Sequence, residues 1–95
     1  MLLVHLALAG PPGAPGTRDE AAALQDALWA HAAPHHALEH VRVQCAPHGL
    51  GVALFIRTSS DTAARRQASD LLAHVLGTVP GACRYSVIAG PAVST

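Results

Sequence analysis

The spacing of the apolar residues changes along this chain of 95 residues, and the order of the changes constrains the fold more than any other feature. Short apolar runs, and runs in which apolar and polar residues alternate, are typical of strands. Apolar residues three and four positions apart are typical of helices. The pattern predicts strands over 2–9, 39–45, 50–57 and 83–89, and helices over 18–33 and from the capping residues 59–61 to 76.

Turn and capping residues mark the ends of these elements. Thr17 and Glu20 have the spacing of a capping box at the start of the first helix. Gly77 is the expected C-cap of the second helix. Gly90, followed by Pro91, predicts the end of the last strand.

The order strand, helix, strand, strand, helix, strand is that of the ferredoxin-like βαββαβ plait, an α+β fold. In this fold two helices cover one face of a four-stranded antiparallel sheet with the strand order 4-1-3-2. The second and fourth strands then lie at opposite edges. Cys45 and Cys83 are therefore expected to be too far apart for a disulfide, which needs Cα atoms within about 7 Å. We expect both to be buried, reduced thiols.

The composition indicates a single domain over 1–95. Hydrophobic residues make up 51% of the chain, enough for one core, and only 13% are charged, which favours self-association. The formal net charge is zero, which argues against nucleic acid as a partner. All six cations are Arg, a bias typical of a bacterial protein from a GC-rich genome. The apolar run 2–9 is too short to span a membrane, so we expect a cytoplasmic protein with no membrane partner.

The segment GPPGAPG, residues 10–16, is a candidate for phosphate binding, because glycines ahead of a helix can expose N–H donors. Three of its seven residues are prolines, however, so we interpret it as a rigid crossover. Other functions of this fold need a CxxC motif, several aromatic residues on the sheet, an Asn, or four Cys for an iron–sulfur cluster. The sequence supplies none of these sets, and we expect no cofactor.

Four of the seven histidines lie within residues 31–40. His36 and His40 have the i, i+4 spacing of a metal site on a helix, but Pro34 predicts the end of the preceding helix. In an extended chain these two residues are about 13 Å apart, at 3.3 Å per residue. We therefore expect no metal site. A pH-sensitive interface, in which the histidines repel one another once they are charged, stays open as an alternative.

The face of the sheet turned away from the helices is the predicted interaction surface. Alternation along the strands places five residues there that could contact a partner: His5, Arg42, Phe55, Arg57 and Arg84. The face is half apolar, and its arginines can bind carboxylates or phosphates. Because the chain carries so few charges, we expect a partner to cover this face.

Two hypotheses of function follow from this surface. The first is a non-catalytic accessory domain that forms a homodimer through its exposed sheet face, or binds a protein or peptide partner there. The second is a small enzyme or ligand-binding protein with a pocket at the sheet face. Dimeric α+β-barrel proteins, some of which are enzymes, resemble two such plaits joined through their sheets.

An enzyme would need a base or a nucleophile from this sequence. His5 or His74 is the candidate base. Cys45 with His40 or His48 is the candidate nucleophile pair, although we expect Cys45 to face the core, where a thiol is inert. No carboxylate is placed by the pattern to orient any of these histidines, so we favour the non-catalytic function.

Overall fold

In the computed structural model, which describes residues 1–10, 16–82 and 84–94, the chain forms four strands and two long helices. A short 3-10 turn, η1, joins the first helix to the second strand. The elements in chain order are β1 (Leu2–Ala9), α1 (Arg18–His31), η1 (Pro34–His36), β2 (Leu38–Ala46), β3 (Gly49–Ile56), α2 (Asp61–Thr78) and β4 (Ser86–Ser94). The predicted order of elements is confirmed.

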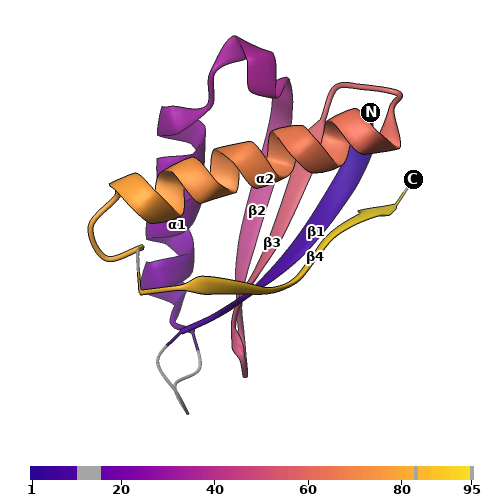
Figure 1. Cartoon of the computed structure of the whole chain (residues 1–95). Helices are drawn as coiled ribbons and strands as arrows, with labels where there is room; N and C mark the ends of the chain where they lie inside the picture. Colours follow the sequence, from indigo (N-terminus) through magenta and orange to yellow (C-terminus); the bar gives the residue numbers. More distant parts are fainter. Residues whose placement is uncertain (11–15, 83, 95) are drawn as a thin grey trace.

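The strands form one antiparallel sheet, and both helices cover the same face of it (Figure 1). The strand order is β2-β3-β1-β4, which is the predicted order 4-1-3-2 read in reverse. β1 pairs with β3 in continuous register, from Leu2 opposite Ile56 to Ala9 opposite Gly49. α1 packs beside β2, while α2 lies over β1, β3 and β4. The ferredoxin-like α+β architecture is therefore shown.

The core lies between the sheet and the two helices. It is built from alternate positions of the strands and from one stripe of each helix, as the apolar spacing predicts. The largest fully buried side chains are Val4, Leu8, Leu28, Val41, Leu50, Leu54, Ile56, Leu71, Leu72 and Val75. Burial of one such aliphatic side chain contributes about 1.5–3 kcal/mol to stability. This packing holds both helices on one face of the sheet and leaves the other face open.

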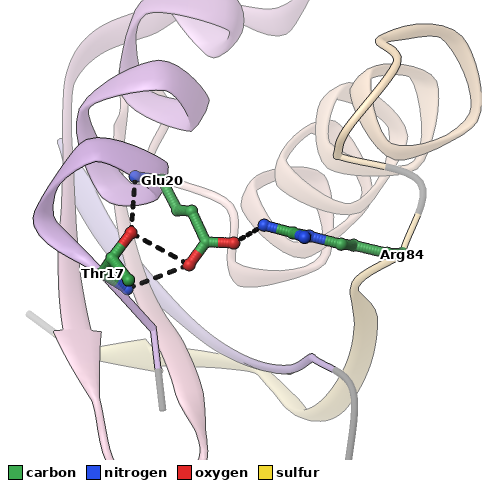
Figure 2. Close-up of polar contacts among 3 residues, drawn as sticks. All are labelled: Thr17, Glu20 and Arg84. Atoms are coloured by element: carbon green, nitrogen blue, oxygen red, sulfur yellow. Dashed lines mark hydrogen bonds and ion pairs between the residues drawn. The ribbon is translucent and has the colours of Figure 1, made fainter. Parts of the chain in front are cut away.

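The capping box at the start of α1 is confirmed (Figure 2). The backbone N–H of Glu20 donates to Thr17 Oγ1 at 3.1 Å, and the backbone N–H of Thr17 donates to Glu20 Oε1 at 3.1 Å. The second carboxylate oxygen of Glu20 pairs with Arg84, in the turn before β4. One carboxylate therefore links the start of α1 to the segment that follows α2.

α1 ends two residues earlier than predicted, at His31 rather than at 33. The backbone of Ala32 is already extended, with φ −66° and ψ 123°. Ala33 is extended as well, because it precedes Pro34 and a proline disfavours the helical conformation of the residue before it.

α2 ends later than predicted. It continues through Gly77 to Thr78, so the expectation that Gly77 is the C-cap is wrong. Val79 is the C-cap, and it is extended because Pro80 follows it. Within the described part of the chain, no helix is both long enough and apolar enough to cross a membrane.

β4 begins and ends later than predicted. It runs from Ser86 to Ser94 and includes Gly90 and Pro91, which were expected to end it. Two register shifts against β1 accommodate the irregularity. Gly90 has φ +96°, and a Cβ there would lie 2.4 Å from the carbonyl oxygen of His5. The edge strand β4 therefore does not end at Gly90 and Pro91. Its pairing with β1 continues past them to Ser94.

Cys45 is exposed, which corrects the prediction of a buried thiol. It pairs across the sheet with Leu50, near the end of β2. Since β2 is an edge strand, the groove between α1 and β2 stays open to solvent at Cys45. Cys83 and residues 11–15 of the predicted crossover lie outside the described residues.

Candidate functional site

The open face of the sheet carries the candidate site, and the strand register shows which side chains are neighbours there. Three rows of side chains cross the sheet in the order β2, β3, β1, β4. The first row is His40, Phe55, Leu3 and Ser94; the second is Arg42, Ala53, His5 and Ala92; the third is Gln44, Gly51, Ala7 and Ala89. A row with aromatic and apolar residues therefore borders rows in which the central residues are mostly small.

The small residues leave a hollow in this face. Its volume is about 440 Å³, which is within the range of small-molecule sites. Gly51 and Ala53 contribute to its lining. The polar side chains that line it are His5, His40, Arg42 and Gln44. The hollow has room for a small molecule or for side chains of a partner.

Three of the five predicted surface residues, His5, Arg42 and Phe55, line this hollow. Phe55 is half-buried in the middle of the first row. His5 Nε2 lies 3.3 Å from Ser94 Oγ, which joins β1 to β4 by a side-chain hydrogen bond. Arg42 is exposed and forms no ion pair with any described residue. Its guanidinium is therefore available to an anion.

Arg57 and Arg84 lie outside the hollow. Arg57 follows the end of β3, and its Nε lies 2.6 Å from Glu39 Oε1. Arg84 lies on the helix side of the molecule, where it pairs with Glu20 (Figure 2). Its predicted position on the open face is wrong, because β4 begins only at Ser86.

Three aromatic rings, those of Phe55 on β3, His40 on β2 and Trp29 on α1, lie next to one another at the β2 edge of the sheet. The His40 ring centroid lies 5.5 Å from that of Phe55 and 6.2 Å from that of Trp29. Trp29 is 42% exposed and is the single tryptophan of the chain. Its fluorescence should therefore respond to changes at His40 and in the hollow.

Other histidines of the His-rich segment gather where α1, η1 and α2 meet. The ring centroids of His31 and His74 lie 5.2 Å apart. Those of His35 and His36 lie 4.1 Å apart. The segment thus supplies a cluster on the helix side of the molecule, while His40 points to the open face.

His36 is the buried member of this cluster. Its Nδ1 accepts a hydrogen bond of 2.9 Å from the backbone N–H of Ala33. Burial lowers the pKa of His36, and the charge on His35 lowers it further. Asp70 opposes this shift, while His74 adds to it. Both the hydrogen bond and the pKa favour a neutral imidazole in the folded protein.

The structure places His36 and His40 in different surroundings. His36 is buried in η1, whereas the exposed His40 lies on β2 and lines the hollow. In the described residues, no group of three or more His, Cys, Asp or Glu side chains is arranged to hold a metal ion.

The candidate catalytic groups are not brought together. His40 faces the hollow, whereas Cys45 borders the groove on the opposite face of β2. His48 lies in the turn between β2 and β3, and His74 lies on α2 beside His31. His5 forms no ion pair with a carboxylate of the described residues. The predicted nucleophile Cys45 and the candidate base His40 therefore lie on opposite faces of the sheet.

Sequence reasoning missed His40 and Gly51 among the residues that line the hollow. The alternation that places Arg42 and Gln44 on the open face places His40 there too, so the signal lies in the period of two. Gly51 has no side chain to fill the space above it. That space becomes part of a hollow only because the strand register sets Gly51 beside other small residues.

No protein-family model, curated protein or solved structure matches this chain.

Proposed function

We propose that this chain forms a homodimer through the open face of its sheet and acts as a non-catalytic accessory domain for protein interaction. The observation that carries the proposal is the chemistry of the two central strands on this face. They present mostly apolar and small residues: Leu3, Ala7, Gly51, Ala53 and Phe55, together with His5. A contiguous apolar surface of this kind is typical of a protein interface.

The open face is better suited to pairing than the edges of the sheet. At the β2 edge, the backbone N–H of Val43 already donates to Gln25 Oε1 at 3.0 Å, so α1 hinders the addition of a strand there. At the β4 edge, two register shifts and Pro91 interrupt the row of backbone donors and acceptors.

A second copy of the chain is the partner that fits this face. A two-fold interface sets the same patch opposite itself, and here the row with Phe55 and Leu3 borders the hollow. With the two-fold axis along the middle row, these larger side chains of each copy meet the row of Gly51 and Ala7 in the other copy, and the space over Ala53 lies between the two middle rows. Stacked sheets pack about 10 Å apart, a distance that suits this alternation of large and small side chains.

We further propose that the dimer works in the cytoplasm of a bacterial cell. Cys45 is an exposed free thiol, and such thiols persist in reducing compartments. The use of Arg for all six cations is the feature that favours a bacterial source.

Sedimentation equilibrium of matched variants tests the dimer interface. Phe55→Glu places a carboxylate in the centre of the proposed interface and should convert the dimer into a monomer, because a buried unpaired charge costs several kcal/mol. Ala73→Glu adds the same charge at an exposed position of α2, and it should leave the dimer intact.

Circular dichroism shows whether each variant folds, and Ala53→Glu, on the same face, serves as a second interface variant if Phe55→Glu does not fold. A dimer that persists in the folded Phe55→Glu or Ala53→Glu variant contradicts the proposed interface.

A further inference from the structure

The open face carries more positive charge than its own side chains neutralise. Arg57 pairs with Glu39, whereas Arg42 pairs with no residue that the structure describes. The proposed dimer brings two copies of Arg42 into the space between the sheets, and the residues lining each hollow include no carboxylate. A guanidinium that is removed from water needs an anionic partner. The dimer therefore favours an anion within its interface.

The register sets two polar side chains on either side of the hollow. Arg42 on β2 and His5 on β1 flank Ala53 on β3. Because β3 lies between them, β2 and β1 are two strand spacings apart, or about 10 Å. A small ligand that lies over Ala53 is within reach of the guanidinium from one side and of the imidazole from the other. Gln44, in the next row, adds an amide donor to this polar part of the hollow.

The neighbouring row makes the other part of the hollow apolar and aromatic. Leu3 and Phe55 line it, and the His40 ring centroid lies 5.5 Å from that of Phe55. Aromatic rings attract one another at centroid distances of about 4.5–7 Å. A ligand with a planar ring next to its anionic group would contact both parts of the hollow at once.

We propose that the hollow binds a small aromatic carboxylate between the two copies of the dimer, with the carboxylate on Arg42 and the ring against Phe55. Guanidinium and carboxylate match through two parallel N–H···O bonds. A phosphate has the charge but no ring, so it would leave the aromatic row without a contact. This inference rests on the proposed dimer and names the ligand chemistry that the dimer would hold.

Calorimetric titration with benzoate tests the site, and the fluorescence of Trp29 gives a second signal from the other side of His40. Light scattering first measures whether the titrated protein is a dimer. The wild-type dimer should bind benzoate at least roughly tenfold more tightly than benzamide, which has the ring without the charge. Inorganic phosphate, which has the charge without the ring, should also bind more weakly than benzoate.

Two arginine variants identify the anchor. Arg42→Met keeps most of the side-chain length and should weaken benzoate binding at least roughly tenfold, without changing the oligomeric state. Arg66→Met removes an exposed arginine of α2 and should leave the affinity unchanged. A dimer that binds benzoate no more tightly than benzamide or phosphate, or equally well in Arg42→Met, overturns the ligand assignment while the dimer stands. A monomeric wild-type chain overturns the proposed dimer instead.

Discussion

Protonation of His36 links the acidity of the solution to the stability of the fold. In the folded chain its Nδ1 accepts the N–H of Ala33, and an imidazolium could not accept that bond. The groups around it are His35 in η1 and Asp70 and His74 on α2, of which only Asp70 favours the charged form. The pKa of His36 is therefore lower in the folded chain than the usual value of 6.5.

The sign of the pH dependence follows from this shift. Well above pH 6.5 His36 is neutral in both the folded and the unfolded chain, and the fold keeps its full stability. As the pH falls below that value, the unfolded chain binds the proton first, and stability is lost until the folded pKa is passed.

We predict that His36→Asn makes the unfolding temperature less sensitive to acid. The Asn Oδ1 can accept a hydrogen bond from the Ala33 N–H in place of Nδ1, and it does not titrate. At pH 8 the free energy of unfolding of the variant should therefore lie within about 1–2 kcal/mol of the wild-type value. Thermal unfolding at pH 8 and pH 5.5 measures the difference. His48→Asn, in the exposed β2–β3 turn, is the control and should keep the wild-type loss. An equal loss in His36→Asn and the wild type would show that His36 is not the group responsible.

At the scale of the elements, α2 carries a glycine that weakens it. Gly77 lies in the last turn of the helix, one residue before its end, and a Cβ there would meet no atom within 4 Å. Gly77→Ala should therefore stabilise the protein by about 1 kcal/mol, because alanine loses less conformational freedom in a helix. For a domain of this size, the unfolding temperature should rise by roughly 4–8 °C.

Gly81→Ala is the matched control for this prediction. Gly81 also has open space around it, but its φ is +85°. Alanine there should cost about 1 kcal/mol instead of adding stability. If both substitutions destabilised the protein, the assignment of Gly77 to the last turn of α2 would be wrong.

The elements also show which sequence signals are sufficient for prediction. The stripe with Leu24 and Leu28, and the alternation through Val52, Leu54 and Ile56, predict buried faces, and all five side chains are buried. These signals are periodic, so many residues agree with one another. The predicted ends of α2 and β4 depend on one or two Gly or Pro residues. The local preferences of these residues are overridden, because helix packing continues past Gly77 and strand pairing continues past Gly90 and Pro91.

At the scale of the whole molecule, the candidate site depends on registers that no local pattern contains. Alternation is sufficient to place His5, Arg42 and Phe55 on one face. It cannot show that Gly51 and Ala53 together form a hollow, or that Arg84 lies before β4 and reaches across to Glu20. Both depend on contacts between residues far apart in the chain.

For the whole molecule, we propose that a second copy of the chain covers the open face of the sheet. Static light scattering of the wild-type protein across the micromolar range, at pH 8 and so above the usual pKa of histidine, measures this most directly. We predict the mass of two chains. The mass of one chain throughout that range would contradict the claim.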